Sequence, residues 1–85
     1  MLQPCVDVVY RRLGDTGVLV HLGTNEIFEI NDTGARIWEL LAEGQLPEAV
    51  VGTLVSEFDI DPPTARLECG ELIDALVSRK LLEAT

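Results

Sequence analysis

The stretch EIFEINDTGARIWELL, residues 26–41, changes its hydrophobic period partway along. Residues 26–30 alternate with a period of two, which is typical of a strand. From Asp32 onward the apolar residues recur every three or four positions, which is typical of a helix. The change falls within residues 31–33, so a strand passes into a helix with almost no loop. This junction predicts a mixed α and β fold.

The two faces of the strand at residues 26–30 differ. Phe28 and Ile30 share a face that a core can bury, whereas the other face pairs Ile27 with Glu29 and is only half polar. The segment holds no proline to block pairing and no lysine to discourage it. Its edge is therefore suited to an incoming strand, unless the N-terminal segment or a second copy of the chain covers it.

Two further strands are predicted before it. Residues 5–11 place Val6, Val8 and Tyr10 on one face, and residues 18–23 do the same with Val18, Val20 and Leu22. Turn residues separate the segments at 14–17 and again at 23–25. Short turns between three strands predict an antiparallel meander, whose shared apolar face must be covered by other elements.

Three helices are predicted after the sheet. The first is capped by Asn31 or Asp32 and ends near Gly44. Its buried stripe is expected to consist of Ile37, Trp38 and Leu41. The second begins at Pro47, a residue suited to a first helical turn, and carries Val50, Val51, Leu54, Val55 and Phe58.

The third helix has a strong start signal at residues 61–63, an aspartate followed by two prolines. It is expected to run to about Lys80 with a core stripe of Ala65, Cys69, Leu72 and Leu76, and Leu81 and Leu82 tie the chain end to the core. The expected fold is a single α+β domain over residues 1–85. A three-stranded antiparallel sheet packs on three helices that are similar to a winged helix-turn-helix.

Fifteen acidic residues against six basic ones give a net charge of −9. Such a surface repels nucleic-acid phosphates and attracts basic segments. The third helix would be the DNA-reading one, yet Glu68, Glu71 and Asp74 lie along its middle. Nucleic acid is therefore not expected as a partner. An acidic winged-helix module that regulates or binds another protein stays open as an alternative.

The sequence offers no arrangement typical of an enzyme. His21 is the only histidine, Cys5 and Cys69 are far apart, and the glycines form no phosphate-binding loop. No catalytic residue, metal or cofactor is expected. No apolar run approaches the roughly 20 residues of a membrane span, and no signal peptide is evident, so a cytoplasmic location is expected.

The order of elements, with the junction IND-T (Ile30–Thr33), then IWELL (Ile37–Leu41), a glycine and LIDALVSRKLL (Leu72–Leu82), resembles the PQQ synthesis protein D (PqqD) family. Members of that family are precursor-peptide recognition elements of pathways that modify ribosomally made peptides. The resemblance covers roughly residues 15–83. A free-standing chain of this length is similar to those of lasso-peptide biosynthesis.

The resemblance implies a non-catalytic adaptor. Such a domain binds the leader segment of a precursor peptide as an added strand and delivers it to a separate leader peptidase, and in the lasso group also to a cyclase. It implies a cleft between the third strand and the third helix. The residues expected to bind the leader are Glu26, Ile27, Phe28, Glu29, Ile30, Leu67, Gly70, Ile73, Asp74 and Val77.

Overall fold

A computed structural model describes residues 2–84, so the two terminal residues of the expected domain lie outside it. Three helices follow a set of short strands along this part of the chain. In order, the elements are β1 (Leu2–Pro4), β2 (Val8–Leu13), β3 (Thr16–His21), β4 (Glu26–Ile30), α1 (Asp32–Ala42), α2 (Pro47–Phe58), α3 (Pro62–Ser78) and β5 (Leu82–Ala84).

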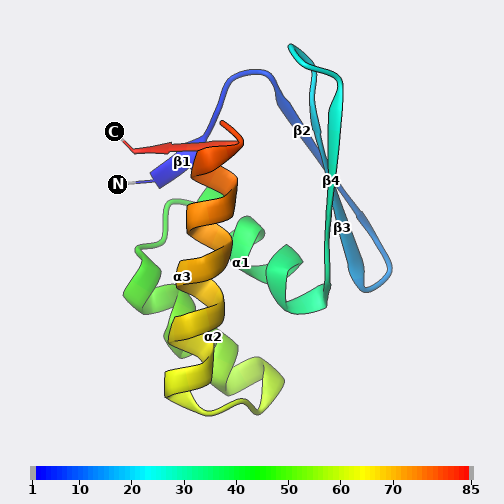
Figure 1. The fold of residues 1–85 in the computed structure, drawn as a ribbon. Helices are drawn as coiled ribbons and strands as arrows, with labels where there is room; N and C mark the ends of the chain where they lie inside the picture. Colours follow the sequence, from blue (N-terminus) through cyan, green and yellow to red (C-terminus); the bar gives the residue numbers. More distant parts are fainter. Residues whose placement is uncertain (1, 85) are drawn as a thin grey trace.

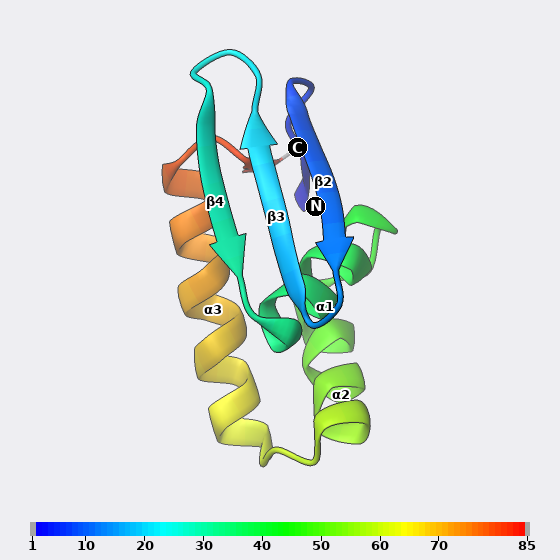
Figure 2. The same ribbon diagram turned by 90° about the vertical axis from the view of Figure 1, so that its right-hand side faces the viewer.

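Strands β2, β3 and β4 form an antiparallel sheet in the order β2-β3-β4, which leaves β4 at an edge. Figure 1 shows this sheet on one side of the molecule and the helices on the other. Figure 2 shows α3 running alongside β4. The α+β class and the N-terminal three-stranded antiparallel sheet are confirmed.

The predicted first strand begins three residues too early. Cys5, Val6 and Asp7 lie outside β2, and Val6 is 95% exposed instead of sharing a face with Tyr10. The reason is a pairing that the sequence did not indicate, because β1 lies antiparallel to β5 in a separate two-stranded sheet. The chain therefore turns between β1 and β2, so that β1 pairs with β5 and β2 pairs with β3.

The buried face of β3 is also opposite to the predicted one. Leu19 is fully buried, whereas Val18 and Val20 lie on the other face of the sheet and Leu22 is exposed in the following turn. Gly17 explains the choice: a Cβ there would lie 2.9 Å from the Cβ of Ala35. The missing side chain lets α1 pack closely on the face that carries Gly17 and Leu19.

The helix boundaries follow the cap residues. Asn31 is the N-cap of α1, and its side chain accepts a hydrogen bond of 2.8 Å from the Gly34 N–H. Gly44 adopts a φ of +95° just after α1, as expected of a helix-ending glycine. Pro47 begins α2 as predicted. Helix α3 ends at Ser78, two residues before the predicted end.

Helix α1 lies at the centre of the core. It contacts β3 and β4 on one side and α2 and α3 on the other. Its buried Ile37, Trp38 and Leu41 are those predicted, and Leu81 and Leu82 are buried as expected. Because α1 follows β4 directly, the edge of the sheet is held against the helical layer. Within residues 2–84, none of the helices is both long and apolar enough to cross a membrane.

Candidate functional site: the edge of β4 and its cleft

The backbone groups of β4 divide between β3 and open space. The Leu22 N–H donates to the Asp7 carbonyl at 2.8 Å, on the β2 side of the sheet. Backbone groups alternate in direction along a strand, so even-numbered positions of β3 pair with β2 and odd-numbered ones pair with β4.

The register between β3 and β4 shows which backbone groups of β4 are free. Residues 17, 19 and 21 of β3 face residues 30, 28 and 26 of β4. These three residues of β4 therefore bond to β3, and Ile27 and Glu29 direct their N–H and C=O groups away from the sheet. No other strand in residues 2–84 pairs with this edge, and the N-terminal β1 pairs with β5 instead.

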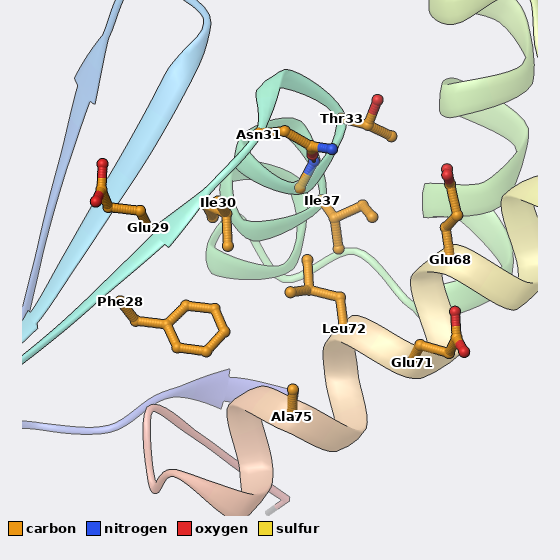
Figure 3. A pocket seen from close by; sticks show the side chains of 11 residues that line it. Phe28, Glu29, Ile30, Asn31, Thr33, Ile37, Glu68, Glu71, Leu72 and Ala75 are labelled. Carbon is orange, nitrogen blue, oxygen red and sulfur yellow. Dashed lines mark hydrogen bonds between the residues drawn. The ribbon is translucent and has the colours of Figure 1, made fainter.

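A cleft of about 370 Å³ lies between this edge and α3, with the start of α1 at one end. Figure 3 shows its lining residues converging from the three elements. They are Phe28, Glu29, Ile30, Asn31, Thr33, Gly34, Ile37, Glu68, Glu71, Leu72 and Ala75.

The floor of the cleft is apolar. Phe28 and Ile30 come from β4 and lie opposite Leu72 and Ala75 of α3 (Figure 3). Gly34 allows this approach, because a Cβ there would lie 3.1 Å from the Cβ of Ile30 and 3.4 Å from a methyl of Leu72. An apolar floor beside free backbone groups can hold a side chain and pair a main chain at once.

The rim of the cleft is charged. Glu68 and Glu71 project from α3, whereas the Glu29 side chain points away from α3, so that Glu29 borders the cleft mainly with its backbone (Figure 3). At the other end Arg79 lies over the Phe28 ring, 4.9 Å from its centroid, and 3.9 Å from the Glu26 carboxylate. Both acidic and basic groups therefore face this space.

The structure places the predicted site residues in several regions. The five predicted strand residues form β4 itself, and three of them line the cleft. The predicted helix residues do not line it. Gly70 and Ile73 line a hollow between α2 and α3, Val77 lines one near Cys5, and Leu67 and Asp74 are exposed.

The expected stripe of α3 was therefore on the wrong flank. Ala65, Cys69 and Leu76 are buried as predicted, but the flank that faces β4 carries Glu68, Glu71, Leu72 and Ala75. The opposite flank is more apolar, and α2 covers it in part. The sequence signal that was missed is Leu72 with Ala75, an apolar pair three residues apart that follows two glutamates on the same flank.

Gly70 lies within α3, where a glycine either allows close packing within the chain or leaves a hollow that a ligand can enter. Nothing lies within 4 Å of where its Cβ would be, so close packing is wrong. It borders the hollow of about 630 Å³ between α2 and α3, which Val51, Val55 and Ile73 also line. The position of Gly70 therefore belongs to a different surface from the cleft at β4.

The two cysteines do not line the cleft at β4. Cys5 and Cys69 are both free thiols, and burial raises the pKa of the Cys69 thiol. Within the described part of the chain, no group of three or more histidine, cysteine, aspartate or glutamate residues is placed to hold a metal ion. The chemistry that the site offers is therefore backbone pairing, apolar contact and charge.

An open sheet edge beside a helix, with an apolar floor between them, is an arrangement suited to peptide binding by strand addition. The family model described as coenzyme PQQ synthesis protein D (PqqD) matches residues 16–82, and the chain belongs to this family. The comparison with curated proteins finds none that matches.

Two solved structures are similar over nearly the whole chain. "TbiB1 in Complex with the TbiA(beta) Leader Peptide" is 35% identical, with a TM-score of 0.89 over 98% of this chain and 96% of that one. "Lasso peptide synthetase B1 complexed with the leader peptide" is 22% identical, with a TM-score of 0.88 over 98% of each chain. The second supports the shared fold alone.

Proposed function

We propose that this protein binds the leader segment of a ribosomally made precursor peptide, which adds as a strand to the edge of β4. The observation that supports this most is the pair of free backbone positions, Ile27 and Glu29, beside the cleft to α3. The PqqD family and the leader-peptide complex of a 35% identical relative agree with it.

Binding divides into two contributions. Each N–H and C=O of Ile27 and Glu29 can pair with the added strand, and a net hydrogen bond contributes about 0.5–1.5 kcal/mol. Alternate side chains of that strand point toward α3, where Phe28, Leu72 and Ala75 form the floor. An apolar side chain buried there contributes about 1.5–3 kcal/mol. Backbone pairing thus supplies affinity and the floor supplies selectivity.

The role that follows is that of an adaptor in lasso-peptide biosynthesis. The domain performs no chemistry on the precursor and presents it to separate enzymes, a leader peptidase and in turn a cyclase. Support comes from the match to the PqqD family and from the leader-peptide complex of the 35% identical relative.

A direct titration tests the binding. Fluorescein-labelled TbiA(beta) leader peptide is titrated with the protein and followed by anisotropy, with a scrambled leader as the control peptide. The variant Ala75→Leu fills the floor and should weaken binding about tenfold, or about 1.4 kcal/mol. The matched variant Asp74→Leu adds the same side chain at an exposed neighbour and should bind like the parent.

The alternative, an acidic winged-helix module that regulates or binds another protein, is tested in the same assay, with labelled duplex DNA as the probe of a regulatory role. We expect no DNA binding, because Glu68 and Glu71 line α3 and the net charge is −9. Binding of duplex DNA without binding of the leader would contradict the proposed function. Equal binding of the leader and its scrambled form would contradict it as well.

A further inference from the structure

Arg79 crosses the gap between α3 and β4 at one end of the cleft. Its guanidinium carbon lies 4.9 Å from the Phe28 ring centroid, and a guanidinium nitrogen lies 3.9 Å from the Glu26 carboxylate. The residues that line the cleft extend only as far as Phe28 and Ala75 in this direction. Arg79 therefore bounds the cleft with a positive charge at the start of β4.

The opposite end of the cleft is negative. Glu68 and Glu71 of α3 line this end of the cleft together with Asn31 and Thr33, where β4 passes into α1. Neither glutamate makes an ion pair with a described residue, whereas the other cleft-facing charge, Arg79, pairs with Glu26. One end of the cleft thus carries two carboxylates, and the other end carries a guanidinium that is paired with Glu26.

The spacing of these charges suits a strand. Glu71 in α3 and Arg79, the C-cap residue of α3, are eight residues apart, or about 12 Å along a helix that rises about 1.5 Å per residue. Figure 2 shows α3 running alongside β4. An added strand covers about 12 Å in about four residues, and residues four apart in a strand point to the same face. Two side chains on one face of a strand can therefore reach both ends.

We propose that the cleft recognises the order of charges in the bound peptide, an inference that rests on the proposed function. The bound segment has a lysine or arginine at the end near Glu68 and Glu71. Two residues on, an apolar side chain lies over the floor, and two residues beyond that an aspartate or glutamate meets Arg79. A segment with the opposite order places like charges together at both ends. The charges thereby set the register and direction of the strand along β4.

A charge scan of the TbiA(beta) leader tests this order. Lysine or glutamate replaces each residue of the leader in turn, and each peptide is titrated against the protein. We expect one position where lysine binds about two- to fivefold better than glutamate, as exposed charge pairs allow. Four residues away the preference should be reversed by a similar factor.

Charge reversals in the protein assign the two positions. The double variant Glu68→Lys with Glu71→Lys should invert the preference at the first position only, and Arg79→Glu should invert it at the second only. Lys80→Glu is the matched control, because it reverses a neighbouring charge that is not over Phe28. It should leave both preferences unchanged, and circular dichroism checks the fold of each variant.

The outcomes separate this inference from the proposed function. If the unmodified leader binds but the scan is flat, or the variants leave the preferences in place, the charge order is wrong and the leader-binding function stands. If the unmodified leader does not bind, both proposals are overturned. If each set of charge reversals inverts the lysine or glutamate preference at its own leader position, both the charge order and the leader-binding function are supported.

Discussion

The Tyr10 hydroxyl donates a hydrogen bond of 2.6 Å to the Glu39 carboxylate and so joins β2 to α1. Arg12 donates to the same carboxylate at 2.8 Å and to Asp32 at 2.8 Å. A guanidinium nitrogen of Arg36 lies 3.6 Å from the Glu39 carboxylate. Glu39 is thus the acceptor through which the far strand of the sheet is fixed on the helix that follows β4. The cluster therefore helps to hold the sheet, whose edge strand is β4, on α1.

Replacing Glu39 by alanine should lower the free energy of unfolding by about 2–3 kcal/mol, because hydrogen bonds to a charged group are lost and the Tyr10 and Arg12 donors lose a partner. Urea unfolding followed by circular dichroism measures this. Glu43→Ala, at an exposed position one turn further along, should change stability by less than about 0.5 kcal/mol. An equal loss in the two variants would contradict the role of the cluster.

The same cluster predicts how stability depends on acid. The hydrogen bond from Arg12 is the main reason that the pKa of Glu39 lies below its ordinary value of 4.5. A carboxyl group with a lowered pKa stabilises the folded state above its unfolded pKa, and that contribution disappears as the pH falls through the folded value. Urea midpoints should therefore fall below about pH 4.5 in the parent, and less so in Glu39→Gln.

At high pH the stability of the fold depends on the protonation of Tyr10. Burial and the hydrogen bond to Glu39 raise the pKa of the Tyr10 hydroxyl from 10.0 to about 12. The protonated phenol is favoured by folding, so this contribution is complete below pH 10 and declines between pH 10 and 12. Tyr10→Phe should be less stable at pH 7 and should lose less stability than the parent over that interval. If the stability of Tyr10→Phe and of the parent falls equally as the pH rises through this interval, the prediction is wrong.

Local signals predicted the binding strand well. The change of period at Asn31, the capping side chain and the alternation along β4 depend on neighbouring residues, so a sequence contains them in full. The three-residue strands β1 and β5 were missed, because a strand of that length shows no period. Their pairing also joins the two ends of the chain, which no local pattern reports.

The flank of α3 was not predictable in the same way. The line through Ala65, Cys69 and Leu76 is buried and was recognised, but both of its flanks face grooves. Which flank meets β4 depends on the side of α3 that α2 occupies, a relation between whole elements. Composition pointed to the more apolar flank with Ile73. The cleft at β4 is instead lined by Leu72 and Ala75, which follow two glutamates on the other flank.

Proline on β4 tests strand addition. Ile27→Pro and Glu29→Pro each remove an N–H that faces the edge and should leave the bonds to β3 intact. We expect each to weaken binding of the TbiA(beta) leader about tenfold, or about 1.4 kcal/mol, while the fold persists.

Alanine at the same two positions is the control for the proline variants. Ile27→Ala and Glu29→Ala keep the edge N–H groups, so most of the affinity should remain. Circular dichroism and thermal melting check that each variant is folded. If both proline variants bind the leader like the parent, the peptide does not add to this edge.

A substitution at Gly70 tests whether the leader occupies the hollow between α2 and α3, which Gly70 lines, or the cleft at β4, which it does not line. A glycine within a helix costs about 0.5–1 kcal/mol relative to alanine, and nothing lies within 4 Å of where a Cβ would be at this position. Gly70→Ala should therefore raise the free energy of unfolding by about that amount. Leader affinity should not change, since Gly70 does not line the cleft at β4.

Gly17→Ala is the matched control for Gly70→Ala, because its Cβ would lie 2.9 Å from both the Ala35 Cβ and a side-chain carbon of Ile30. That contact forces β3 away from α1, so the control should lower stability by about 1–3 kcal/mol, as overpacking does. Urea unfolding and leader titration on both variants give the comparison. A Gly70→Ala protein that is more stable yet has lost the leader would show that the peptide reaches the α2–α3 hollow, and the site would then have to extend around α3.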